Sequence, residues 1–255
     1  MSYLDTAIDA ARQAGALLRE HYEGDLLVND ALAHDLKLEL DVRSQDLITD
    51  IILKAHPDHA IFGEEGLGGN QESPFQWIVD PIDGTVNFFY GIPHFCISIA
   101  MREGGKDGEL TVGVIYDPML DELYAVGAGV EPNRNGKPIS VSNRATLAEA
   151  IITVGFSKTN EGMEAGIERF KRIAQKVRKT RMLGSAALGM AYVASGRLDA
   201  YIEESVSLWD IAAGQLLIER AGGKVVRKDK GDDTMGVVSS NGKLPLDDLE
   251  KDVGR

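Results

Sequence analysis

Apolar residues recur every three or four positions along the first segment of the chain, with polar residues between them. The apolar stripe consists of Ala7, Ile8, Ala11, Ala14, Leu17, Leu18 and Tyr22. This spacing predicts an amphipathic helix that packs its apolar face on the core. A second helix is predicted over Asp41–Ala55 and ends before His56-Pro57, because a residue that precedes proline disfavours helical geometry.

Short runs of β-branched and aromatic residues follow, separated by turns rich in Gly and Asp. They predict a sheet with mainly antiparallel strands. The strands are expected within residues 60–65, 76–81, 94–101, 110–118 and 122–129. The Asn-Gly pair inside residues 133–141 predicts a tight hairpin turn.

The pattern changes after residue 148, where β-like runs alternate with helical stretches. The runs lie at 150–156, 197–203 and 223–227, and the helical stretches lie near 163–177, 185–195 and 210–220. Such alternation is typical of α/β structure. We therefore expect an α+β half over residues 1–145 and an α/β half over residues 146–255.

Composition adds information about partners. The 255 residues include 40 acids and 27 Lys or Arg, which gives a formal net charge of −13. This balance disfavours nucleic acid as a partner, because binding to phosphate backbones needs clustered basic residues. No apolar run approaches the roughly 18 residues of a membrane span, and the N-terminus lacks a signal-peptide pattern. The single Cys96 excludes an internal disulfide framework, so we expect a cytoplasmic protein.

Some of the acids occur at unusual positions, where a β-like run ends beside Gly or Pro. They are found in Gly63-Glu64-Glu65, Asp80-Pro81-Ile82-Asp83-Gly84-Thr85, Trp209-Asp210 and at Asp41. Apolar neighbours would draw these carboxylates inward, where an unpaired charge is costly. A cluster of oxygen ligands without His or Cys favours Mg²⁺, Mn²⁺ or Ca²⁺ over Zn²⁺.

The Asp80–Thr85 motif is the most informative of the four. Pro81 and Gly84 are expected to form a sharp turn that points both aspartates to one side, and Ile82 offers a carbonyl oxygen. Gly84 and Thr85 then open a stretch whose backbone N–H groups can receive a phosphate oxygen. The motif predicts a metal and phosphate site.

These motifs resemble the inositol monophosphatase family of Mg²⁺-dependent, lithium-sensitive phosphatases. The resemblance covers nearly the whole chain and rests on DPIDGTVNF, the upstream GEE, the downstream WDIAAG, and also GSAA, LDAYIE and AGG. It implies a layered α-β-α-β-α sandwich like that of fructose bisphosphatase. It also implies a homodimer.

The resemblance assigns ligands to two metal ions. Glu64, Asp80 and the Ile82 carbonyl would hold one ion, while Asp80, Asp83 and Asp210 would hold the second. Two divalent ions ~3.5–4 Å apart can clamp the attacking and leaving oxygens of a phosphoryl transfer. A third, weaker ion near Glu64 is common in the family.

The resemblance also assigns catalytic and substrate-binding roles. Asp41, Thr85 and Glu64 are the expected catalytic residues, with Thr85 hydrogen-bonded to Asp41 so that the pair orients the attacking water. The expected phosphate and substrate contacts are Asp83, Gly84, Thr85, Ser157, Ala186 and Glu203. Glu203 matches the acid that binds a substrate hydroxyl in the family.

The chain departs from the family pattern ahead of the second helix. Leu38 replaces a Thr in the Asp-x-x-Thr-x-x-Asp pattern, which here runs from Asp35 to Asp41. The preceding segment, which matches a mobile loop over the metals, carries Asp30 and His34 where a Lys is frequent. Lithium sensitivity and the affinity for a third ion are therefore left open.

The expected activity is Mg²⁺-dependent hydrolysis of inositol monophosphate or a related polyol or sugar phosphate. Val86-Asn87-Phe88 after the motif favours the inositol branch over the branches for phosphoadenosine phosphate and histidinol phosphate. Fructose bisphosphate is the first alternative substrate. A non-catalytic binding or regulatory protein is the second alternative, motivated by the altered segment before Asp41.

Overall fold

The structure is a computed structural model that describes all residues except 25–27, 33–34, 157–159, 232–233, 248–249 and 251–255. The helices are α1 (Tyr3–His21), α2 (Glu39–Ala55), α3 (Thr85–Phe89), α4 (Asn160–Ala174), α5 (Ala186–Ala194) and α6 (Leu208–Arg220). Two short 3-10 turns cover Gly105–Asp107 and Leu147–Glu149.

The larger sheet has eight strands in the order β10-β9-β8-β7-β6-β5-β3-β4. They are β3 (Ala60–Gly63), β4 (Gly66–Gly69), β5 (Phe75–Asp83), β6 (Cys96–Glu103), β7 (Glu109–Asp117), β8 (Glu122–Gly127), β9 (Val130–Arg134) and β10 (Lys137–Pro138). Only the β3–β5 pair is parallel. The predicted Asn-Gly turn joins β9 to β10, and both of its residues adopt the positive φ that this turn requires.

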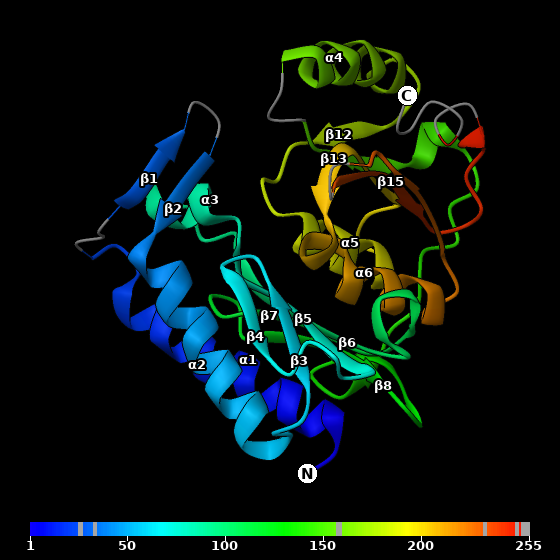
Figure 1. Cartoon of the computed structure of the whole chain (residues 1–255). Helices are drawn as coiled ribbons and strands as arrows, with labels where there is room; N and C mark the ends of the chain where they lie inside the picture. Colours follow the sequence, from blue (N-terminus) through cyan, green and yellow to red (C-terminus); the bar gives the residue numbers. More distant parts are fainter. Residues whose placement is uncertain (25–27, 33–34, 157–159, 232–233, 248–249, 251–255) are drawn as a thin grey trace.

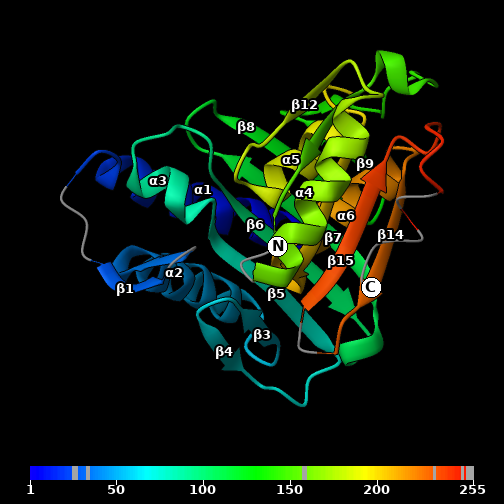
Figure 2. The same cartoon turned by 90° about the horizontal axis from the view of Figure 1, so that it is seen from above.

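The second sheet has five strands in the order β12-β11-β13-β15-β14. They are β11 (Ile151–Val154), β12 (Lys179–Arg181), β13 (Ala200–Ser207), β14 (Lys224–Asp229) and β15 (Thr234–Ser240). β11, β12 and β13 are parallel, whereas β15 is antiparallel to both β13 and β14. Figure 2 shows β14 and β15 side by side at one edge of this sheet.

Five layers follow one another, as Figure 1 shows. α1 and α2 cover one face of the larger sheet, α5 and α6 lie between the two sheets, and α4 covers the outer face of the second sheet. This is the predicted α-β-α-β-α sandwich. None of the helices in the described residues is long and apolar enough to cross a membrane.

Strand β5 shows how the sequence produces these layers. Trp77 and Val79 belong to the apolar core under α1 and α2, while Ile78 belongs to the core around α5 and α6. Successive side chains of a strand point to opposite faces, so a strand between two helical layers must be apolar on both. Asp80, two residues after Ile78, therefore faces the layer of α5 and α6.

The expected division at residue 145 falls between the two sheets, after β10 and before β11. The central apolar core crosses this division, because it joins residues of β5 and β6 to residues of α5, α6 and β13. Burial of this shared apolar surface holds the two halves together.

Candidate active site

A one-residue bulge brings Asp80 and Asp83 to the same face of β5. Residues three apart on a regular strand point to opposite faces. Here Asp80 pairs with Ser98 but Asp83 pairs with Cys96, so three steps along β5 match two steps along β6. The extra residue turns Asp83 back to the side of Asp80. The expected sharp turn at Pro81 is thus a bulge within the strand.

The chain turns sharply one residue later, at Gly84. Its φ is +99°, and an added Cβ would lie 3.1 Å from the His94 carbonyl oxygen and 3.2 Å from that of Gly184. Positive φ and this close packing both require glycine. The turn ends β5 and starts the short helix α3 at Thr85.

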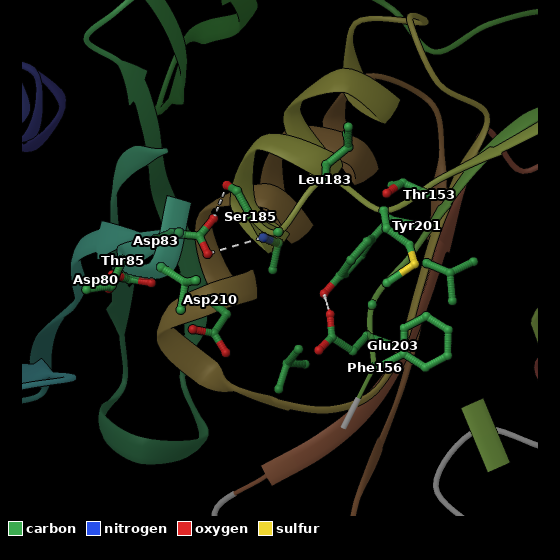
Figure 3. A pocket seen from close by; sticks show the side chains of 18 of the residues that line it. Asp80, Asp83, Thr85, Thr153, Phe156, Leu183, Ser185, Tyr201, Glu203 and Asp210 are labelled. Carbon is green, nitrogen blue, oxygen red and sulfur yellow. Dashed lines mark hydrogen bonds between the residues drawn. The ribbon is translucent and has the colours of Figure 1, made fainter. Parts of the chain in front are cut away.

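Asp210 reaches the same place from the first turn of α6. Its Oδ2 accepts a hydrogen bond of 2.7 Å from the Ser207 backbone N–H, which caps the helix. One carboxylate oxygen from each of Asp80, Asp83 and Asp210 lies within 4.8 Å of the other two. Figure 3 shows the three side chains converging at one end of a pocket. The larger sheet and the helical layer between the two sheets thus both contribute to the cluster.

The electrostatics of this cluster are unfavourable without a cation. Burial raises the pKa of Asp80 well above its usual range, and the charges of Glu64, Asp83 and Asp210 raise it further. Burial also raises the pKa of Asp210, followed by repulsion from Asp83 and Glu64. None of the ion pairs in the described part of the chain includes Asp80, Asp83 or Asp210.

The start of helix α5 supports Asp83. Asp83 Oδ2 accepts hydrogen bonds from Ser185 Oγ at 2.5 Å and from the Ala187 N–H at 2.7 Å, while Oδ1 accepts one from the Ala186 N–H at 3.2 Å. The Cys96 thiol lies 3.6 Å from Oδ2. Burial raises the pKa of Asp83, and these donors oppose that rise. Ser185 was not among the predicted site residues, although the GSAA motif contains it.

Asp41 and Thr85 lie together beside the cluster. Thr85 Oγ1 is 3.3 Å from Asp41 Oδ1 and donates at 2.9 Å to the Ile82 carbonyl oxygen. Leu38, which replaces the family's Thr, donates its backbone N–H to Asp41 Oδ2 at 2.6 Å. Burial raises the pKa of Asp41 to about 7, against the lowering effect of the Leu38 N–H.

Asp80, Asp83 and Asp210 line a cavity of about 330 Å³, which is within the range of small-molecule sites. Glu64, Ile82, Gly84 and Thr85 also line its acidic end. Tyr201 and Glu203 lie further along the wall, with Phe156 and Leu183 (Figure 3). Ala186 also lines the cavity, next to Asp83. Ser157, the remaining predicted contact, is outside the described residues.

The segment before Asp41 differs from the expectation. The resemblance implies a loop over the metals, but β1 (Val28–Leu32) and β2 (Asp35–Leu38) pair as an antiparallel hairpin. β2 runs directly into α2 and lies next to α3. Asp30 is in β1, and His34 is outside the described residues. Two short strands with mixed polar composition gave no clear alternation to predict.

Comparisons with known proteins agree with this geometry. The inositol monophosphatase family profile matches residues 1–248. The chain is 40% identical to "Nus factor SuhB" of Pasteurella multocida over 87% of this chain and 84% of the relative. It is 37% identical to "Inositol-1-monophosphatase" of Mesorhizobium japonicum over 93% and 91%, respectively.

A solved structure of inositol monophosphatase from Anabaena (Nostoc) sp. PCC 7120 superposes with a TM-score of 0.82 at 35% identity. The superposition covers 98% of this chain and 94% of that one. The fold, the acidic cluster and the family match lead to the same conclusion: the chain belongs to the inositol monophosphatase family and is a phosphomonoesterase.

Proposed function

We propose that the protein is a Mg²⁺-dependent phosphatase that hydrolyses inositol monophosphate or a related polyol or sugar phosphate. The observation that carries the proposal is the convergence of Asp80, Asp83 and Asp210 in a cavity. Their oxygens are the ligands that Mg²⁺ prefers. Burial raises the pKa of Asp80 most, and a divalent cation would relieve the repulsion from neighbouring acids that raises it further.

The family ligand sets fit the residues at this end of the cavity. Glu64, Asp80 and the Ile82 carbonyl would hold one ion, and Asp80, Asp83 and Asp210 the second. The bound cations would supply positive charge against the phosphoryl oxygens and lower the pKa of water. A third ion near Glu64 remains part of the proposal.

Asp41 and Thr85 would handle the proton of the attacking water. Thr85 Oγ1 lies between the Ile82 carbonyl and Asp41 Oδ1, so its hydroxyl can pass a proton from water to Asp41. The raised pKa of Asp41, about 7, suits a group that accepts a proton near neutral pH. The water oxygen then bonds to phosphorus, the bond from phosphorus to the ester oxygen breaks, and the leaving oxygen takes up a proton from solvent to give the alcohol.

The remaining contacts would bind the substrate. The backbone N–H groups of Gly84 and Thr85 are proposed to contact phosphate oxygens at the acidic end. Ala186 and Glu203, which also line the cavity, are proposed to contact the leaving alcohol. Ser157 is proposed as a further contact from the family resemblance alone.

The test is a panel of phosphate esters at equal concentration, with Mg²⁺ and with a chelator. The panel contains inositol, fructose bis-, phosphoadenosine and histidinol phosphates. We expect phosphate release that needs Mg²⁺ and favours the inositol ester. The Asp80→Asn variant controls for a contaminating phosphatase. Preference for the nucleotide, or equal release in chelator, would refute the proposal.

A binding or regulatory role is a second candidate, because the relative from Pasteurella multocida is named "Nus factor". The arrangement of Asp41 beside Thr85 argues against a purely non-catalytic protein, since binding alone does not need a proton acceptor there. Binding of Mg²⁺ without turnover of any ester in the panel would favour this second role.

We further propose a cytoplasmic homodimer. The family resemblance supports the dimer, and the buried, reduced Cys96 suits a reducing compartment. A solution mass equal to one chain would refute the dimer.

A further inference from the structure

A second functional feature lies at the far end of the cavity, on strand β13. Tyr201 and Glu203 are two residues apart, so their side chains share the face of the strand that lines the cavity. The Tyr201 hydroxyl donates a 2.5 Å hydrogen bond to Glu203 Oε2. Figure 3 shows the two side chains meeting away from the acidic cluster.

Two glycines make space for this pair. An added Cβ at Gly155, just after β11, would lie 1.7 Å from Glu203 Oε2. An added Cβ at Gly189, in α5, would lie 3.3 Å from the Tyr201 ring. The carboxylate therefore fits against bare backbone, and the ring fits against a helix surface without a side chain.

The direction of this hydrogen bond is determined by chemistry. Burial raises the pKa of Tyr201 well above its usual range, so the phenol keeps its proton and is the donor. An ionised carboxylate only accepts hydrogen bonds. A carboxylate held by the phenol therefore presents an oriented acceptor to a hydroxyl donor in the cavity.

We propose that Tyr201 is a positioning residue that orients Glu203 towards a hydroxyl of the leaving alcohol, and so contributes selectivity for polyol phosphates. The inference rests on the proposed function and assigns its leaving-group selectivity to a specific pair. It implies that an ester whose leaving group has no further hydroxyl is insensitive to Tyr201.

The test compares Tyr201→Phe with the wild type on inositol monophosphate and on p-nitrophenyl phosphate, whose leaving group offers no additional hydroxyl. We expect KM for the inositol ester to rise about tenfold, the effect of losing an oriented hydrogen bond to a charged group. Both kcat and KM for the nitrophenyl ester should stay within about twofold of the wild type.

The chain offers a matched control in Tyr124, which is also buried on a strand and donates to a glutamate two residues away, Glu122. That pair does not line the cavity. Tyr124→Phe should leave the ratio of the two esters unchanged. Glu203→Gln should reproduce the selective loss, and combining it with Tyr201→Phe should add little further loss, because both changes remove one coupled interaction.

Equal losses on both esters would show that Tyr201 has only a structural role and would overturn the inference. No loss on either ester would also overturn it. Calorimetric binding of inositol monophosphate in Mg²⁺ separates this inference from the proposed function. Absence of wild-type turnover on either ester would refute the function, whereas weaker binding by Tyr201→Phe would still support the positioning role. Equal binding of inositol monophosphate by the wild type and Tyr201→Phe, or binding by neither, would overturn the positioning role.

Discussion

Buried carboxylates occur in two settings in this protein, and their neighbours differ. Asp199 accepts hydrogen bonds from Ser142 Oγ at 2.5 Å, Arg144 Nε at 2.6 Å and the Ile151 N–H at 2.7 Å. Glu204 forms a buried ion pair with Arg169 of α4. By contrast, the charges that act most strongly on Asp80 are all negative.

The difference separates acids whose charge is compensated by neighbouring protein groups from acids that could bind a cation. A buried acid with basic and N–H partners is compensated within the protein. A buried acid among other acids is compensated only by protonation or by a cation. Strand alternation keeps the two kinds apart even for neighbours, since Glu203 faces the cavity and Glu204 faces Arg169.

The largest expected effect comes from Asp210→Asn. The amide oxygen can still accept the Ser207 N–H and cap α6, but the variant removes one charged ligand. Mg²⁺-dependent turnover should fall about a thousandfold, which corresponds to ~4 kcal/mol of lost transition-state stabilisation. The metal-free melting temperature should rise by about 3 °C, because a repelling charge is removed. A fall in both turnover and the metal-free melting temperature would contradict the idea that Asp210 repels its acidic neighbours in the metal-free protein.

Asp199→Asn should have the opposite profile. The change weakens the buried contact with Arg144, so we expect a loss of about 3 kcal/mol in the free energy of unfolding. Turnover per folded molecule should stay close to that of the wild type. Denaturant unfolding and active-site-normalised kinetics measure the two quantities, and a selective loss of turnover would be inconsistent with a structural role.

The pH dependence of the metal-free protein provides a third test. The pKa of Asp41 is raised from 3.8 to about 7, and the pKa values of Asp80 and Asp210 are also raised. Above pH 3.8 the folded state therefore binds more protons than the unfolded state. These acids therefore stabilise the fold less as pH rises through about 7. Mg²⁺ at about 100 times its Kd should restore about 2.7 kcal/mol at neutral pH.

The control for this titration is Asp210→Asn, whose metal-free stability should fall less steeply with pH than that of the wild type. Burial lowers the pKa values of His56, His59 and His94, and these groups act in the other direction at acidic pH. For this reason the slopes are compared between proteins by thermal melts at matched pH. If stability fell with pH equally steeply in both proteins, Asp210 would not contribute to this pH dependence.

The smallest expected effect is that of Ser185→Ala. It removes one donor to Asp83 and the side-chain cap of α5, so the Mg²⁺ concentration for half-maximal activity should rise about tenfold. Turnover at saturating Mg²⁺ should change by less than about threefold. Ser185→Thr keeps a hydroxyl and should restore the wild-type Mg²⁺ dependence; failure to do so would show that the hydroxyl is not what matters.

The sequence alone predicted the layered fold and the residues of the acidic end. Long periodic segments such as α1 and the strands β5 to β8 carry their own signal, and the DPIDGT, GEE and WDIAAG motifs carry the family resemblance. The short strands β4 and β12 and the β1–β2 hairpin were not predicted, because a few residues give little periodicity. β15 was also missed, although it is seven residues long.

The supporting contacts of the site were beyond prediction for a different reason. Ser185 and Asp83 are 102 positions apart, and Tyr201 acts through a hydroxyl whose partner depends on the strand face. Neither contact can be derived from local spacing. The bulge in β5 was likewise hidden, because Pro81 is compatible with both a turn and a bulge.

The bulge has a consequence for how this site can be lost. Without the bulge, Asp80 and Asp83 would be three regular steps apart on β5, and the second carboxylate would point towards α1 and α2, into an apolar layer. Every acid would still be present in the chain, yet they would no longer converge. The capacity to hold a cation here therefore depends on the local backbone conformation of the strand as much as on the identity of its residues.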